Sequence, residues 1–244
     1  MQGIINLDKP AGISSARAVS RVKRLLPRGT KIGHAGTLDP FATGVLLLLV
    51  GKATKQCERL MGEAKQYETT IKLGATTATL DPESPEEPYR CSTGDLAVLA
   101  VNENNPSWDT NPHGRVARAT VEEILPRFVG EIQQRPPAFS AMKVGGQRAY
   151  KLARSGETVE LAPRTVRVYG IELLDYDWPF LRLRIDCGRG TYIRSIARDV
   201  GEALGVGGYL TQLRRTRIGS FDASAAVTIE QLEADGVERH LHAI

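Results

Sequence analysis

Hydrophobic and polar positions alternate in several parts of the chain and recur at helical spacing in others. Two-residue periodicity and an abundance of β-forming residues predict strands at residues 3–7, 66–73, 164–174 and 181–187. Helical spacing of apolar positions, together with capping and charge signals at the ends, predicts helices at residues 14–26, 120–129, 149–155 and 193–204. An unbroken aliphatic run at residues 45–50 predicts an element buried on both faces.

The order of these elements mixes strands and helices without a regular strand–helix–strand repeat. It predicts an α+β domain with a mixed, largely antiparallel central sheet flanked by helices. Residues 31–44 contain three glycines and one proline and predict an irregular loop. Residues 81–120 are polar, and within them a surface insertion is expected at about 92–115, with residues 102–112 dispensable for catalysis.

The composition is that of a soluble globular protein and indicates no particular activity. The 244 residues are 41% hydrophobic and 25% charged, as in ordinary soluble globular proteins, and the net charge is +4. Six basic and no acidic residues occur from Arg17 to Lys31, and a second basic group follows at residues 214–217. Each group alone is typical of a solvated face, and together they also suit a polyanionic partner.

Several kinds of site are not supported by the sequence. The three cysteines, Cys57, Cys91 and Cys187, are odd in number and lack CxxC spacing, which favours reduced thiols over a disulfide framework or zinc site. The histidine spacing predicts no metal site. The N-terminus has no signal peptide pattern, and the longest aliphatic run is too short to cross a bilayer. A soluble cytoplasmic protein without a membrane partner is expected.

Motifs for cofactor-dependent chemistry are also missing. The sequence contains no GxxxxGK[ST], no complete GxGxxG after a strand, no HExxH and no GxSxG, so no cofactor is expected and chemistry would rely on side chains. Asp39 stands out because a proline follows it and glycines lie on both sides, which allows close backbone approach to a ligand. An Asp-Pro pair by itself ordinarily ends a turn, and His34 by itself is ordinarily a surface histidine.

Residues 33–44, with the sequence GHAGTLDPFATG, closely resemble the central motif of the TruB family, the tRNA pseudouridine-55 synthases. Further matches follow in the family's order at NLDKPAG (6–12), KQYE (65–68), PPAFSAMK (136–143), GTYIRS (190–195) and LTQLRRT (210–216). The resemblance covers essentially the whole chain except residues 81–120. It implies the pseudouridine synthase fold with an RNA-binding catalytic cleft.

The resemblance also implies roles for individual residues. Asp39 matches the family's catalytic carboxylate, and Arg194 matches the arginine that keeps it ionised. Tyr67 matches the tyrosine that stacks on the target base and is a candidate for the later deprotonation at C5. Tyr192 and Leu213 would line the same pocket.

Reaching a base inside a folded tRNA loop requires that it be flipped out, which costs a few kcal/mol of stacking. His34 matches the family histidine that inserts where the flipped nucleotides were. Lys9, Lys143 and the basic stretch from Arg17 to Lys31 are then expected to face phosphates. The expected partner is tRNA, bound through its T-stem and loop by a monomer without a guide RNA.

The chain is expected to form one catalytic domain over residues 1–244, with an N-terminal part of about 1–190 and a C-terminal part of about 191–244. It ends without room for the small RNA-binding PUA domain of many bacterial members, which predicts recognition confined to the T-stem and loop. Two alternatives stay open at this point. One is a tRNA-binding or folding factor that uses the same surface. The other is the catalytic subunit of a guide-RNA-dependent synthase, which the lack of a basic tail disfavours.

Overall fold

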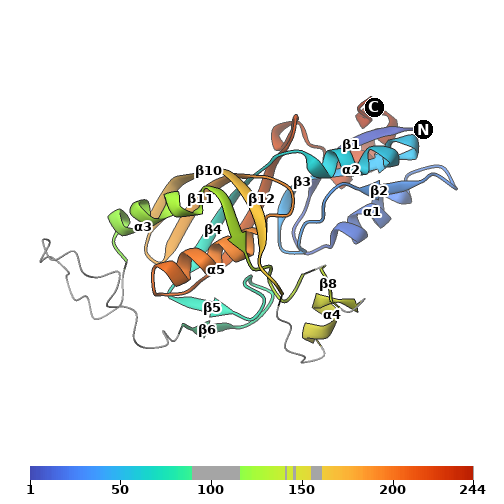
Figure 1. Ribbon diagram of the computed structural model, residues 1–244. Coiled ribbons are helices and arrows are strands. Elements are labelled where there is room, and N and C mark those ends of the chain that lie inside the picture. Colours follow the sequence, from blue (N-terminus) through green and yellow to red (C-terminus); the bar gives the residue numbers. More distant parts are fainter. Residues whose placement is uncertain (90–115, 141, 145–146, 155–160, 244) are drawn as a thin grey trace, which may run out of the picture.

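The computed structural model describes residues 1–89, 116–140, 142–144, 147–154 and 161–243. Nine of the described strands form one sheet, in the order β1-β3-β12-β4-β11-β10-β7, with β2 added to β3 and β13 added to β12 (Figure 1). The strands are β1 Gly3–Lys9, β2 Ile32–His34, β3 Thr43–Val50, β4 Lys65–Leu73, β7 Gly130–Gln134, β10 Arg164–Asp177, β11 Phe180–Cys187, β12 Gly208–Ile218 and β13 Phe221–Asp222. Only β3 and β12 pair in parallel among them, which confirms the mixed, largely antiparallel sheet.

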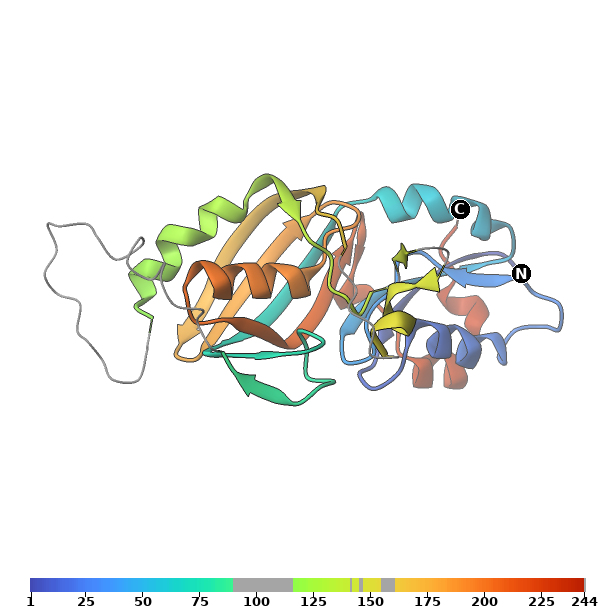
Figure 2. The ribbon, with the colours of Figure 1, turned by 60° about the horizontal axis from the view of Figure 1, so that its bottom comes forward.

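Helices lie at both ends of this sheet. Figures 1 and 2 show α1, α2 and α6 around the β1–β3 end, whereas α5 lies along the strands β4, β11 and β12. The α-helices are α1 Ser15–Lys23, α2 Cys57–Gly62, α3 Arg118–Ile124, α4 Ala149–Arg154, α5 Ile193–Ala203 and α6 Ile229–Asp235. Short 3-10 helices occur at Gly51–Gln56, Leu125–Phe128, Ala223–Ala225 and Val237–His240. Two small hairpins pair β5 (Ala75–Thr77) with β6 (Glu86–Pro88), and β8 (Lys143–Val144) with β9 (Gln147–Arg148).

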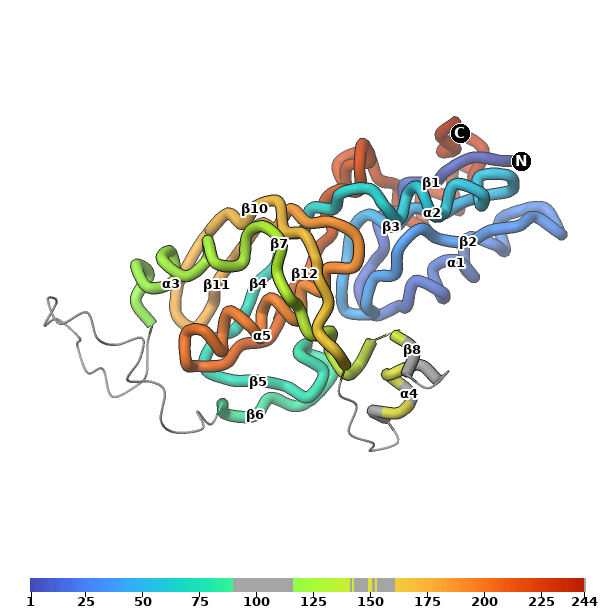
Figure 3. Tube along the Cα trace, viewed as in Figure 1, coloured from blue at the N-terminus to red at the C-terminus, as the bar shows by residue number. Residues whose placement is uncertain are grey.

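The two ends of the chain meet beside β1. Figure 3 shows the N- and C-termini close together, and an isolated bridge pairs Ile4 with His242. Residues 191–244 also supply the central strand β12, which pairs with β3 and β4 from the first part of the chain. The N-terminal and C-terminal parts therefore build one common sheet.

Most predicted elements are present, and the structure adds others that were not predicted, among them β7, α2 and α6. The predicted loop at 31–44 contains β2, which pairs with β3, and the helix predicted at 120–129 is α3 followed by a 3-10 turn. The central strand β12 was not predicted. Its sequence GYLTQLRRTRI carries three arginines, and their charge suggested a solvated face, not a strand inside a sheet. The predicted insertion at about 92–115 lies wholly within residues 90–115, outside the described part of the chain.

The aliphatic run in β3 separates two apolar clusters. Leu46 and Leu48 pack in the main core, while Val45, Leu47 and Leu49 face a second cluster closed by α2. All five side chains are at most 1% exposed, which confirms the element predicted to be buried on both faces. Because β3 is fixed on both sides, the loop that precedes it has a rigid support.

Gly44 is needed where β3 and β12 meet. Its φ is +99°, and a Cβ built there would lie 2.2 Å from the carbonyl oxygen of Arg215. We expect Gly44→Ala to lower the free energy of unfolding by at least about 2 kcal/mol, because both the strained backbone and the clash oppose folding. Urea denaturation measures this. Gly62→Ala is the matched control, since no atom lies within 4 Å of a Cβ at Gly62, and equal stability losses in the two variants would contradict the prediction.

Candidate functional site

The carboxylate of Asp39 forms an ion pair with Arg194, which lies 155 residues away in the sequence. Arg194 Nε lies 3.0 Å from Asp39 Oδ2, and Nη2 donates a hydrogen bond to Oδ1 at 3.2 Å. The Asp39 side chain is 32% exposed, whereas that of Arg194 is only 6% exposed. The expected pairing of the motif aspartate with the arginine at the start of α5 is therefore present, with the carboxylate still open to a ligand.

Local structure explains how Arg194 reaches this position. It is the second residue of α5, whose apolar face packs on the sheet through Ile193, Ile196 and Val200. The chain segment after β7 lies along the same end of the helix, and Arg194 Nη2 donates to the carbonyl of Phe139 at 2.9 Å. Packing of the helix thus sets the place of the guanidinium, and backbone bonds set its orientation.

Asp81 is a second carboxylate on the same guanidinium. Its Oδ2 accepts a hydrogen bond from Arg194 Nη1 at 3.1 Å, and its side chain is 2% exposed. The threonines Thr77 and Thr79 hold it further through their hydroxyl groups. Asp81 is the first residue of the polar stretch that lies outside the family resemblance, and its bond to Arg194 places it at the same guanidinium as Asp39.

The electrostatics of Asp39 follow from these neighbours. Burial raises the pKa of the Asp39 carboxyl group, and the charge of Asp81 raises it as well. The charges of Arg194 and Lys9 lower this pKa but do not cancel the effect of burial. The ionised carboxylate therefore depends on the two cations beside it.

Lys9 lies beneath the loop that carries Asp39. The residue is 0% exposed, and its Nζ donates to the carbonyls of Pro10 (2.7 Å), Ile13 (2.8 Å) and Pro40 (3.2 Å). Burial lowers the pKa of Lys9 to about 8. This placement differs from the expected contact with phosphate, because the three carbonyls occupy the ammonium group. Lys9 supports the loop instead.

Ser15 provides a second anchor for the loop. Its hydroxyl donates to the carbonyl of Leu38 at 3.0 Å, and the amide of Leu38 donates back to the same hydroxyl at 2.8 Å. Ser15 is 1% exposed and opens α1, so the helix and the loop are tied one residue before Asp39. Sequence patterns gave Ser15 only a helix-capping role.

Tyr67 lies on the buried face of β4 and is 7% exposed. Burial raises the pKa of its phenol, and the charge of Asp39 acts in the same direction. Its neighbours across the sheet are Ile185 on β11 and Arg215 on β12. The ring is thus part of the main core and also within electrostatic reach of the candidate carboxylate.

Tyr192 immediately precedes α5 and is half-buried. The side-chain amide of Gln134 accepts from the backbone N–H of Tyr192 at 2.8 Å and donates to its carbonyl at 3.1 Å. The Arg164 guanidinium carbon lies 5.1 Å from the centre of the Tyr192 ring, within the range of a cation–π contact. Gln134 is 0% exposed and was not predicted as a site residue.

Leu213 is 7% exposed on β12 and lines a cavity of about 380 Å³. Phe41 and Thr43, which follow Asp39 in the sequence, also line this cavity, but Asp39 is not among its lining residues. The structure therefore places Leu213 close to the loop in the fold. Its expected contact with a bound base stays a prediction.

His34 ends β2 and is half-buried. Its Nδ1 is buried without a hydrogen-bond partner among the described residues. Burial, and to a lesser degree the charge of Arg215, lowers the pKa of the imidazole. A neutral ring suits the expected role in stacking better than a charged one would, and that role stays a prediction.

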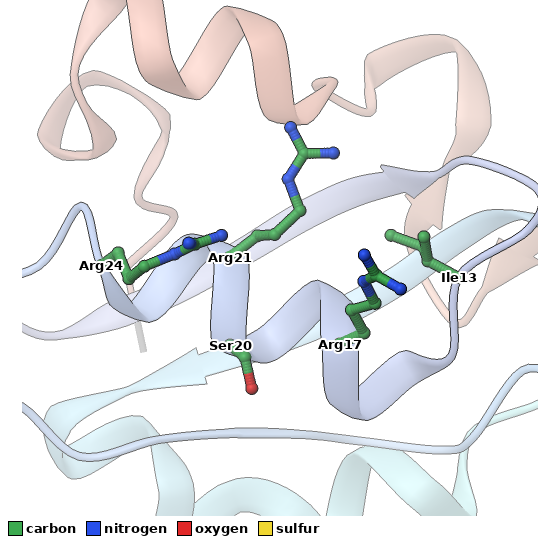
Figure 4. A pocket seen from close by; sticks show the side chains of 5 residues that line it. All are labelled: Ile13, Arg17, Ser20, Arg21 and Arg24. Carbon is green, nitrogen blue, oxygen red and sulfur yellow. The ribbon is translucent and has the colours of Figure 1, made fainter.

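The basic stretch around α1 has a mixed environment. Arg17, Arg21 and Arg24 line a cavity of about 520 Å³ together with Ile13 and Ser20, and Figure 4 shows Ser20 pointing away from the arginines. Arg21 pairs with two acidic residues of α6, at 3.6 Å from Glu230 and 3.4 Å from Glu233. Its charge is therefore partly compensated within the protein. The side chain of Lys143 lies outside the described part of the structure.

Neither a metal centre nor a membrane span is visible in the described residues. Within them, no three His, Cys, Asp or Glu side chains come together in a way that could hold a metal ion. No helix there is both long and apolar enough to cross a bilayer.

Comparison with known proteins identifies the family. The family model for the N-terminal domain of TruB family pseudouridylate synthases matches residues 23–99 and 96–193, and that for the C-terminal domain of tRNA pseudouridylate synthase B matches residues 194–242. The chain belongs to the TruB family. This confirms the resemblance found in the sequence motifs.

Two similar proteins have the same name, tRNA pseudouridine synthase B, and this TruB-family chain aligns with nearly its whole length to each. It is 45% identical over 234 residues to tRNA pseudouridine synthase B of Pseudomonas fluorescens, covering 96% of this chain and 69% of the relative. It is 44% identical over 240 residues to the enzyme of the same name from Cupriavidus metallidurans, covering 98% and 69%. Both alignments extend across the N-terminal and C-terminal parts of the chain.

Solved structures confirm the pseudouridine synthase fold. A chain in the crystal structure of a Cbf5-Nop10-Gar1 complex superposes with a TM-score of 0.67 at 30% identity. A chain of an H/ACA RNP bound to a substrate RNA gives 0.64 at 27% identity. Each covers 98% of this TruB-family chain, which spans 57% and 56% of their respective lengths.

Proposed function

We propose that this TruB-family chain is a tRNA pseudouridine synthase that isomerises the T-loop uridine at position 55. The observation that carries the proposal is the ion pair between Asp39 and the buried Arg194, formed by the family's central motif and the start of α5. Relatives that are 44–45% identical are named for the same activity. The carboxylate is partly exposed and held by a cation, as a group that must act on a nucleotide requires.

The proposed chemistry uses side chains alone. The N-glycosidic bond breaks, the uracil turns over, and its C5 joins the ribose carbon, after which the proton on C5 is removed. Asp39 acts against the ribose, either as a nucleophile or by stabilising positive charge on the sugar. Tyr67 is the candidate for deprotonation at C5. Because its phenol is protonated, it takes the C5 proton as its own proton passes on, and the N1 freed in the first step takes up one proton. Electrons and atoms balance without a redox step, because uridine and pseudouridine are isomers.

Recognition is proposed to involve the T-stem and loop of tRNA, with the target nucleotide flipped into the site. His34 would take the space left in the loop, and Tyr192 and Leu213 would line the base pocket. Lys143 and the exposed arginines of α1 would contact phosphates. We propose that a single copy of the chain acts on tRNA in this way without a guide RNA.

Pseudouridine mapping tests the function directly. The purified protein is incubated with an unmodified tRNA transcript and with a T-stem-loop fragment, and the modified position is read. Conversion of the T-loop uridine by protein alone is expected, and it would exclude dependence on a guide. Binding of tRNA without conversion would favour the alternative of a tRNA-folding factor and would contradict the proposal.

Salt dependence tests the role of α1. We expect Arg17→Gln with Arg24→Gln to reduce the slope of log Kd against log salt by about one to two, because each phosphate contact contributes roughly one unit. The rate at saturating RNA should stay unchanged. Arg127→Gln with Arg167→Gln is the control of equal charge at the other end of the sheet. An unchanged slope in the α1 variant would remove α1 from the RNA-binding surface.

A further inference from the structure

Arg215 has one of the largest fully buried side chains in the described part of the protein, with 1% exposure. Its Nε donates to the carbonyl of Val45 at 2.7 Å, Nη2 donates to that of Gly36 at 3.1 Å, and Nη1 donates to that of Thr37 at 3.4 Å. Gly36 and Thr37 precede Asp39, and Val45 follows it. One guanidinium therefore holds both sides of the catalytic loop.

The side chain of Arg215 is suited to hold the loop because its guanidinium is planar and its five N–H groups point in fixed directions. A lysine at the same place would keep the charge but could not reach three carbonyls in one plane. The contacts therefore fix the shape of the loop and not merely its distance from β12.

The charge of Arg215 has no acidic partner within ion-pair distance among the described residues. Burying a cation without a carboxylate lowers stability, and carbonyl dipoles offset only part of that cost. Departures of this kind from optimal packing are typical of functional sites. The arrangement points to a contribution other than stability.

Arg215 is also the cross-strand neighbour of Tyr67. The two residues are directly opposite in the pairing of β12 with β4, so their side chains project from the same face of the sheet. Burial raises the pKa of the Tyr67 phenol, and the charge of Arg215 acts in the opposite direction. The same charge lowers the pKa of His34 and of Lys9.

We propose that Arg215 is a positioning residue for the isomerisation. It holds the loop that carries Asp39 and the ring of Tyr67 in one fixed arrangement, so that the carboxylate meets the ribose while the phenol faces the base. This inference rests on the proposed function and deepens it. Arg215 acts through Asp39 and Tyr67 and need not touch the substrate.

Single-turnover kinetics with enzyme in excess over a T-stem-loop RNA test the proposal. For Arg215→Lys we expect the rate constant to fall by about 10- to 100-fold, the range reached when reacting groups are misplaced by about 1 Å. The Kd for RNA should stay within about threefold and the reaction amplitude should be unchanged, because the folded fraction and the docking surface are kept. Arg167→Lys, an exposed arginine of β10 paired with Glu131, is the control and should react like wild type.

A double-mutant cycle separates positioning from general loosening of the fold. In a Tyr67→Phe background, Arg215→Lys should lower the rate constant by a smaller factor than in wild type, because the part of its effect that acts through the phenol is already lost while the part that acts through the Asp39 loop remains. An equal loss in both backgrounds, or a wild-type rate constant for Arg215→Lys, would overturn the proposal. Absence of turnover by the wild-type protein would instead reject the proposed function.

A measurement on the unsubstituted arginine covers the case in which Arg215→Lys does not fold. The Nε–H resonance of Arg215, protected from solvent exchange, is followed by NMR in wild type and in Tyr67→Phe, with Leu213→Ala as a control on the same face. A shift in Tyr67→Phe that exceeds the shift in the control is expected. An unmoved resonance would show that Arg215 and Tyr67 are not coupled.

Discussion

Asp39→Asn is expected to abolish pseudouridine formation while tRNA binding persists. The change keeps the size of the side chain but removes the negative charge that is proposed to act on the ribose and that pairs with Arg194 at 3.0 Å. Removal of a central catalytic group lowers rates by at least about 10⁴-fold. Pseudouridine mapping of a T-stem-loop after long incubation measures the loss, and a filter-binding assay measures the Kd, which should change by less than about threefold.

Asp177→Asn is the matched control for this prediction. Asp177 lies at the exposed end of β10, so the same chemical change occurs away from the site. It should react at the wild-type rate. Substantial turnover by Asp39→Asn would remove Asp39 from the chemistry, whereas loss of RNA binding in that variant would show that the carboxylate mainly shapes the docking surface.

Sequence motifs located the centre of this site because its residues lie in short, distinctive segments. The glycine-rich segment around Asp39 and the segment around Arg194 were both recognisable, and the structure joins them by an ion pair. Their contact is not visible in any periodicity, since it depends on how α5 packs on the sheet. The pairing was therefore inferred from family resemblance and then found in the geometry.

The residues that sequence patterns missed act through burial and tertiary hydrogen bonds. Asp81 stands at the start of a polar stretch, where an acidic side chain is normally solvated, yet it is 2% exposed and bonded to Arg194. Lys9 was expected to face phosphate because the family resemblance implied a bound tRNA, yet it is buried against backbone carbonyls. Such placements oppose the ordinary preference of charged residues for water. Only the folded arrangement reveals them.

Burial of a charged side chain also explains why β12 was not predicted. Its arginines alternate between environments: Arg215 is 1% exposed, whereas Arg214 and Arg217 pair with acidic groups at the surface. In a linear pattern all three count as polar, so the strand periodicity is lost. A strand that contains a buried cation is recognised only after the carbonyl groups that solvate it are known.

Arg194→Lys is expected to lower the rate by about 10²-fold and to move the acidic limb of the pH–rate profile to higher pH. Arg194 lowers the pKa of Asp39, so a cation that holds the carboxylate less well lets this pKa rise. A smaller fraction of Asp39 is then ionised at any pH on the acidic limb, and the rate there falls. A lysine cannot contact Asp39, Asp81 and the two carbonyls together, so the geometry is lost as well.

Asp81→Asn supplies the decisive comparison. It also perturbs the guanidinium of Arg194, but it changes the pKa of Asp39 in the opposite direction. The charge of Asp81 raises the pKa of Asp39, so its removal should move the acidic limb to lower pH, even if some rate is lost through a less well held Arg194. Measuring both profiles under single-turnover conditions separates charge from geometry. If the acidic limbs of Arg194→Lys and Asp81→Asn moved in the same direction, Asp39 would not be the group that titrates in that limb. Arg194 would then serve only to orient the carboxylate.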